Sequence, residues 1–221
     1  MKILILITFL FGFQSAHCQV NNKDDEQIYF LMGLMNDYLG RVYSPNDPAK
    51  KYFITDFYSS EQKALEAFVS AIKTSQMKIS DFEISKDGEV DIPAYTTISS
   101  EKFINLFNQF YRFKKADYKY EDKKGKEFSF YWGIIKYSKF KNNTHKKLFL
   151  KGAFIRSGSI TLDGNYQYVY SNPISKHNLT TRFLNSLGCK ILEYKEITET
   201  IPASVTIIFK PTEELKNFLI Y

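Results

Sequence analysis

Cysteine and histidine are scarce in this sequence of 221 residues, which holds two cysteines and three histidines. A chain cut after Cys18 would keep Cys189 alone and could form no internal disulfide. The residue spacings typical of zinc sites, phosphate-binding loops, dinucleotide-binding loops and serine hydrolases are also missing. The sequence therefore predicts no metal site, no cofactor and no catalytic residue, and an enzyme is the less favoured class.

The start of the chain has the pattern of a secretory signal peptide. A lysine follows the first methionine, residues 3–13 are mostly apolar, and small residues stand at the −3 and −1 positions of a cut after Cys18. We expect residues 1–18 to be removed, leaving Gln19 first in a periplasmic or secreted bacterial protein. The alternative is a lipoprotein anchored through Cys18, although His17 stands where such signals carry a small residue.

The remaining residues, 19–221, have the length of a single domain that can bury a core without disulfides. A minor boundary near residues 172–175, at Pro173, is the alternative. No internal repeat is visible in the sequence.

Apolar residues at helical spacing predict helices on both sides of the middle of the chain. They cover residues 28–42, 65–72, 103–111 and 175–187, and a short helix begins at residues 211–214. Residues 189–197 and 204–210 predict two further strands.

Residues 116–172 are predicted to form about four antiparallel strands. Alternation places Phe128, Phe130 and Trp132 on one strand face, and Asp163-Gly164 is a hairpin signal. The apolar run over residues 148–155 is taken as one of these strands. The element order predicts an α+β fold, with N-terminal helices packed on a mostly antiparallel sheet and a C-terminal helix–strand–strand–helix segment.

Positive charge is concentrated in the same stretch. Residues 112–151 carry 13 basic and four acidic residues, whereas the whole chain has a net charge of +6. If two lysine-rich loops lie at one end of the sheet, they form one positive edge beside an aromatic surface, although solvated loops are the plainer explanation. The candidate binding residues are Lys123, Lys124, Lys126, Lys141, Lys146, Lys147, Trp132, Tyr166, Tyr168 and Tyr170.

These features favour an exported, non-enzymatic binding protein with an aromatic, lysine-rimmed sheet surface. The expected partner is an acidic glycan, an anionic surface or an acidic protein. The shortage of arginine in this stretch argues against sequence-specific nucleic acid. The alternative function is an envelope or secreted hydrolase that uses paired carboxylates as acid and base, which needs no signature motif.

Overall fold

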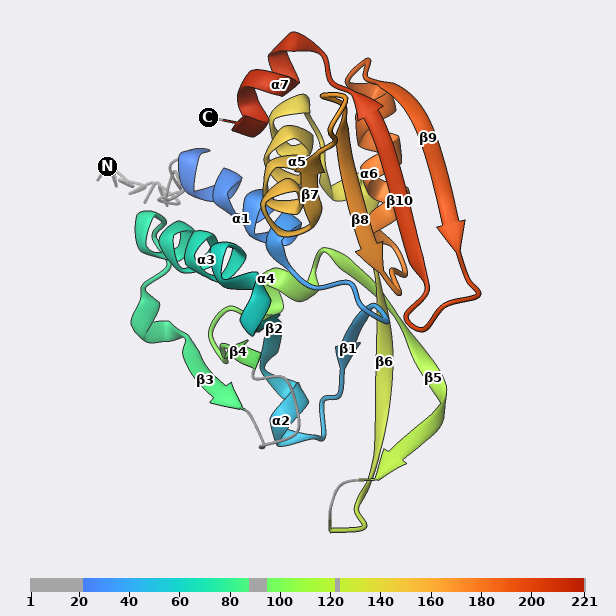
Figure 1. The fold of residues 1–221 in the computed structure, drawn as a ribbon. Coiled ribbons are helices and arrows are strands. Elements are labelled where there is room, and N and C mark those ends of the chain that lie inside the picture. Colours follow the sequence, from blue (N-terminus) through green and yellow to red (C-terminus); the bar gives the residue numbers. More distant parts are fainter. Residues whose placement is uncertain (1–21, 88–94, 122–123, 221) are drawn as a thin grey trace, which may run out of the picture.

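The computed structural model describes residues 22–87, 95–121 and 124–220 (Figure 1). The helices are α1 (Asn22–Leu34), α2 (Pro48–Lys51), α3 (Gln62–Thr74), α4 (Ile104–Asn108), α5 (Asn143–Ser157), α6 (Lys176–Ser186) and α7 (Glu213–Ile220). The strands are β1 (Arg41–Tyr43), β2 (Phe53–Tyr58), β3 (Glu83–Asp87), β4 (Tyr95–Ser99), β5 (Tyr111–Glu121), β6 (Glu127–Ile135), β7 (Gly158–Ile160), β8 (Tyr166–Ser171), β9 (Lys190–Ile197) and β10 (Ser204–Lys210). The predicted signal peptide lies outside the described residues, so export stays a prediction.

Helices α1 and α5 cross at the centre of the molecule, between α3 and the strands β8 and β10 (Figure 1). Their backbones meet at Gly33 and Gly152, where a Cβ atom on Gly33 would lie 2.1 Å from the carbonyl oxygen of Phe149. Glycine is needed on both helices because any larger side chain would separate them. The crossing buries Leu31 and Leu150 completely.

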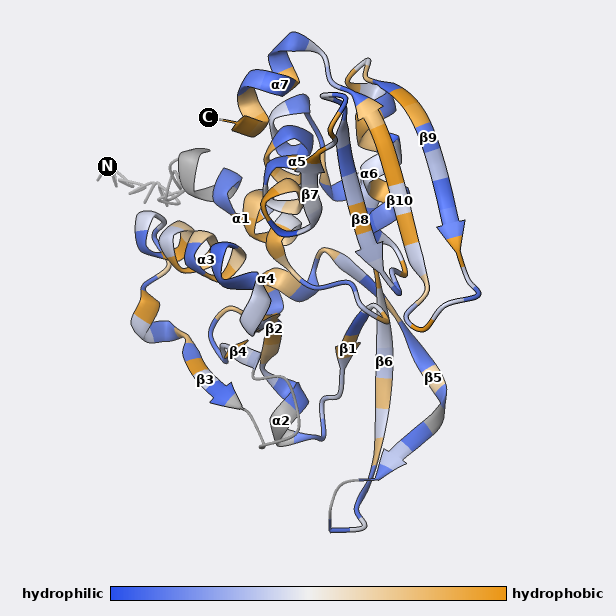
Figure 2. Cartoon of the chain, viewed as in Figure 1, coloured by the Kyte–Doolittle hydropathy of each residue, from blue (hydrophilic) through white to orange (hydrophobic). Residues whose placement is uncertain are grey.

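The C-terminal sheet has the strand order β7–β8–β10–β9, and every pairing is antiparallel. Alternate residues of β8 and β10 are buried against α5 and α6, as the two-residue period of a half-buried strand requires. The residues between them form the opposite, more polar face. Figure 2 shows this contrast along β10, while β9 is mostly hydrophilic.

The hairpin sheet has the order β1–β6–β5, and its two long strands form a ribbon that extends away from the helices (Figure 1). One face packs inward, where Tyr111 and Ile135 are paired and buried. The other face is accessible and carries Arg112 and Lys114. β5 has a bulge between Lys115 and Lys119.

The two halves of the chain repeat one arrangement. A central strand, β6 or β10, pairs antiparallel with the strand that precedes it and with an earlier strand, β1 or β8. Helix α1 precedes the first set and α5 the second. The first half differs by an insertion that contains β2, α3, β3 and β4, and its strands form a third sheet, β2–β4–β3. The repeat lies in topology, and for this reason the sequence did not show it.

The predicted α+β fold with antiparallel sheets is confirmed. The strand predicted over residues 148–155 is wrong, because these residues lie in α5. Asn142 caps this helix by accepting a hydrogen bond from the His145 backbone N–H at 2.8 Å. A short apolar run fits a buried helix as well as a buried strand, so periodicity alone could not distinguish the two here. In the described part of the chain, no helix has both the length and the apolar content to cross a membrane.

Candidate functional site

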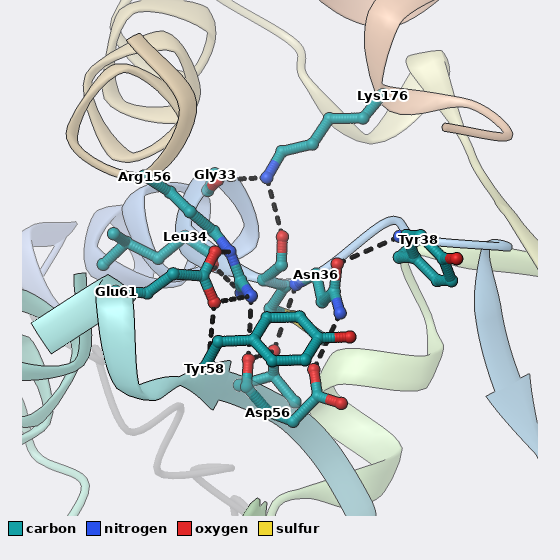
Figure 3. A network of polar contacts seen from close by, with 11 residues as sticks. Gly33, Leu34, Asn36, Tyr38, Asp56, Tyr58, Glu61, Arg156 and Lys176 are labelled. Atoms are coloured by element: carbon teal, nitrogen blue, oxygen red, sulfur yellow. Dashed lines mark hydrogen bonds and ion pairs between the residues drawn. The ribbon is translucent and has the colours of Figure 1, made fainter. Parts of the chain in front are cut away.

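A buried network of polar groups lies where α1 and α5 end (Figure 3). The Arg156 guanidinium donates to both carboxylate oxygens of Glu61, at 2.8 and 2.7 Å. It also donates to the backbone carbonyls of Leu34 and Asp56 at 2.8 and 2.9 Å. Arg156 therefore joins the last carbonyls of α1 to β2 and to the start of α3, where a cation is favoured by the helix dipole.

Lys176, the first residue of α6, enters the same junction from the other side (Figure 3). Its ammonium donates to the Gly33 carbonyl and, at 2.7 Å, to the Met35 carbonyl. The side chain is 2% exposed, and this burial, reinforced by the charge of Arg156, lowers the pKa of Lys176 to about 7. Even the neutral amine has two protons for these two carbonyls.

Asp37 completes the junction by capping α6. Its carboxylate accepts the backbone N–H groups of Ile174, Ser175 and Lys176 at 2.8–3.0 Å. The hollow beside this junction measures about 200 Å³. Its charged groups are committed to one another or to helix ends, so the arrangement supports the fold and offers no free acid–base pair. Among the described residues there is no grouping of three His, Cys, Asp or Glu that could hold a metal ion.

The second candidate is the accessible face of the hairpin sheet, which we call the outer face and which consists of Val42, Arg112, Lys114, Trp132 and Ile134. Strand register pairs Arg112 with Ile134, and Lys114 with Trp132, which is paired with Val42 on its other side. Arg112 and Lys114 are exposed, and neither has an ion-pair partner in the described part of the chain.

Toward the tip of the hairpin, aromatic rings on the same side of β6 are buried, with Phe128 4% and Phe130 5% exposed. Phe130 lies edge-on to Trp132 with ring centres 5.0 Å apart. Tyr120 stacks on Phe128 at 5.5 Å. Near the tip, the Lys126 ammonium lies 4.9 Å from the centre of the Phe128 ring. The chain from β5 to Lys139 has nine basic and four acidic residues, so the hairpin carries a net positive charge.

The lysines that the sequence singled out do not form one edge. Lys124 and Lys126 lie at the hairpin tip, and Lys123 lies outside the described residues. Lys141, Lys146 and Lys147 lie at the start of α5, and Lys147 pairs with Glu214 of α7. Figure 1 places α7 and the hairpin tip at opposite ends of the molecule. The loop predicted over residues 141–147 is mostly the first turn of a helix, which explains the separation.

The three tyrosines of β8 point into the core and do not line an open groove. Tyr166, Tyr168 and Tyr170 are at most 4% exposed. The Tyr168 hydroxyl donates to the Leu150 carbonyl at 3.0 Å, and the Tyr170 hydroxyl bonds Thr180 at 2.8 Å. Each deeply buried hydroxyl thus has a partner within the protein, which removes the need for a ligand. Of the predicted aromatic residues, Trp132 alone lies on the outer face.

Sequence reasoning did not single out Arg112 and Lys114 within the basic stretch. The signal was available, because they occupy alternate positions of a strand whose other positions, Tyr111 and Phe113, are apolar. Sequence reasoning also missed Arg156 and Lys176, for which no local pattern exists, since their partners are 95 to 143 residues away.

Comparison with known proteins gave no matching family model and no matching curated protein. Solved structures of the homing endonuclease I-DmoI are similar to this chain. Its complex with DNA and Mn aligns with 89% of this chain and 97% of its own, at 13% identity and a TM-score of 0.48. Its complex with DNA and Ca aligns with 88% of each chain, at 13% identity and a TM-score of 0.47. Mesophilic variants of I-DmoI align with 88% of this chain and 93% of theirs, at 12% identity and a TM-score of 0.45.

These neighbours contradict the functional expectation drawn from the sequence. An exported, non-enzymatic binding module was expected, with a carboxylate hydrolase as the alternative, and the aligned structures are those of a nuclease in complex with DNA. The prediction of the partners is wrong on the same ground. It named an acidic glycan, an anionic surface or an acidic protein, and it excluded sequence-specific nucleic acid. At these scores the alignments do not define the ligand of this chain, which has to follow from its own surface.

Proposed function

We propose that this protein binds single-stranded nucleic acid along the outer face of the hairpin sheet. The observation that carries the proposal is the cross-strand pair of Lys114 and Trp132, with Arg112 two residues further along the same face. Trp132 is partly exposed, and a cation beside an aromatic ring that a base can reach is the combination that holds a phosphate and stacks on the neighbouring base. The proposal rests on the surface of this chain alone.

Each residue has a separate role. The Arg112 guanidinium and the Lys114 ammonium hold successive phosphates, since residues two apart on a strand are about 7 Å apart. Trp132 stacks on an unpaired base, which a flat indole ring accepts whatever the base is. Val42 and Ile134 flank the indole ring and keep water away from the contact.

The test measures the affinity for a labelled single-stranded oligonucleotide by fluorescence anisotropy at several salt concentrations. For single strands, the slope of log K against log salt becomes shallower by about 0.7 for each phosphate that the protein no longer neutralises. The double variant Arg112→Gln/Lys114→Gln should therefore bind more weakly, with a slope shallower by about 1.4. The matched control Lys63→Gln/Lys73→Gln removes two exposed charges from α3 and should keep the slope of the unmodified protein.

An equal loss of affinity in both double variants would show that only total charge matters, and the proposal would then be wrong. The same oligonucleotide annealed to its full complement, with no unpaired bases, should bind more weakly than the single strand because Trp132 then has no base to stack on.

A further inference from the structure

A second hollow of about 640 Å³ opens beside the outer face, between the hairpin sheet and α6. Three cationic residues line it from three elements: Arg112 of β5, Lys136 directly after β6, and Arg182 of α6. Among its described lining residues there is no Asp or Glu. The hollow therefore collects positive charge that no lining carboxylate neutralises.

The cations are held in place by contacts that leave their charge available. The Arg182 guanidinium lies 3.9 Å from the centre of the Tyr137 ring, an arrangement that fixes its plane. The Lys136 ammonium donates one proton to the Gln109 carbonyl at 3.2 Å and has two more. In the described part of the chain, neither residue forms an ion pair.

The inner wall of the hollow is neutral. Ser175 lines it, and its hydroxyl accepts the Ile135 backbone N–H at 3.3 Å. Behind Ser175 lies Asp37, whose carboxylate is already bonded to the first residues of α6. Apolar side chains, Ile134 and Leu179 among them, line the rest. A cationic rim above an apolar wall suits a ligand with an anionic end and an uncharged body.

The number of cations distinguishes between kinds of phosphate. An internal phosphodiester carries one negative charge, and Arg112 with Lys114 suffices for diesters on the outer face. A phosphomonoester carries a charge of about −1.5 to −2 at pH 7 and has three strong acceptor oxygens. Three cationic residues around one hollow, two of them arginines with forked donors, match the monoester better.

We infer that this hollow binds the terminal phosphomonoester of a nucleic acid strand that lies along the outer face. The inference rests on the proposed function, because Arg112 borders both the outer face and the hollow. A strand that leaves Lys114 and passes Arg112 reaches the hollow next, where Arg182 and Lys136 close on its terminal phosphate. The protein therefore prefers phosphorylated strand ends over hydroxyl ends.

The test compares one labelled oligonucleotide in three forms: with a 5′ phosphate, with a 3′ phosphate, and with hydroxyls at both ends. One of the phosphorylated forms should bind about tenfold more tightly than the hydroxyl form, which is the usual size of one charge-assisted contact. Arg182→Gln/Lys136→Gln should abolish this preference. The matched control Lys190→Gln/Lys195→Gln removes two exposed charges from β9 and should retain it.

The outcomes separate the inference from the proposed function. Equal affinity for all three forms in the unmodified protein would overturn the terminal-phosphate site and leave the outer face standing. No binding of any form would overturn both. Free adenosine 5′-monophosphate should bind at least about tenfold more weakly than the phosphorylated strand, because it lacks the contacts along the outer face. Equal affinity for adenosine 5′-monophosphate and for the phosphorylated strand would assign the hollow to a free nucleotide. The inference that it binds the end of a strand would then be wrong.

Discussion

Gly33 of α1 and Gly152 of α5 lie in direct contact: a Cβ atom on Gly33 would be 3.0 Å from the Cα atom of Gly152. The reverse position is equally close, since a Cβ on Gly152 would be 2.2 Å from the Phe30 carbonyl oxygen. The obstacles are backbone atoms, which cannot rotate away as a side chain can. This crossing sets the distance between the two halves and hence the placement of both sheets.

We expect Gly33→Ala to lower the free energy of unfolding by about 3 kcal/mol or more, at the upper end of overpacking costs. Urea denaturation followed by circular dichroism measures it. Gly164→Ala is the comparison, because a Cβ there meets nothing within 4 Å and only the positive φ of 79° opposes it. That change should cost about 1 kcal/mol. Equal costs would show that α1 and α5 can separate freely.

Lys176 should make stability depend on pH. Burial lowers its pKa from 10.5 to about 7 in the folded state. Between these values the unfolded chain holds a proton that the folded chain does not, so stability rises with pH by at most about 1.4 kcal/mol per unit. Urea midpoints measured from pH 7.5 to 9.5 should therefore rise in the unmodified protein relative to Lys176→Met. If the urea midpoints of the two proteins changed in parallel across that range, the lowered pKa of Lys176 would be contradicted.

The pair of Glu61 and Arg156 should contribute more to stability than a surface pair. The Arg156 side chain is 4% exposed, and removing its partner would leave a buried charge with only carbonyl acceptors. We expect Glu61→Gln to cost about 2 kcal/mol, less than for a fully buried pair because Glu61 is 21% exposed. Asp81→Asn breaks the exposed pair with Lys102 and should cost at most about 1 kcal/mol. Thermal unfolding of both variants measures these costs. Similar losses of stability in the two variants would contradict the larger contribution of the pair of Glu61 and Arg156.

Tyr168 should matter for stability and not for binding. Tyr168→Phe removes the hydrogen bond to the Leu150 carbonyl and should cost about 1 kcal/mol. Its affinity for the oligonucleotide should equal that of the unmodified protein, because the ring packs against α5. If the variant stayed stable but lost affinity, the tyrosines of β8 would take part in binding, and their assignment to the core alone would be wrong.

Local patterns predicted much of the fold but failed where burial was complete. The alternation of β8 and β10 and the turn at Asp163-Gly164 were visible, because strands buried on one face show a period of two. Residues 148–155 of α5 were mistaken for a strand because the helix contacts α1, α3, α6 and β8, and within this stretch Lys151 is the one polar residue that could reveal its period. Its capping residue, Asn142, looked like part of a loop.

The candidate site was partly predictable. The basic stretch and Trp132 could be read from the sequence, since both are local. The position of Arg182 beside Arg112 and Lys136 could not, because it follows from the packing of α6 against a sheet formed more than 40 residues earlier. The same holds for Lys176, whose acceptors belong to α1 and the residue after it.

The emission of Trp132 tests the central claim most directly, because it is the one tryptophan in the sequence and it lies on the outer face. Titration with a single-stranded oligonucleotide should quench the emission as a base stacks on the ring, and added salt should reverse the effect. Heparin, a polyanion without bases, should bind the same cations with little quenching. Unchanged emission while the oligonucleotide binds, or equal quenching by heparin, would contradict the proposal that nucleic acid binds on this face.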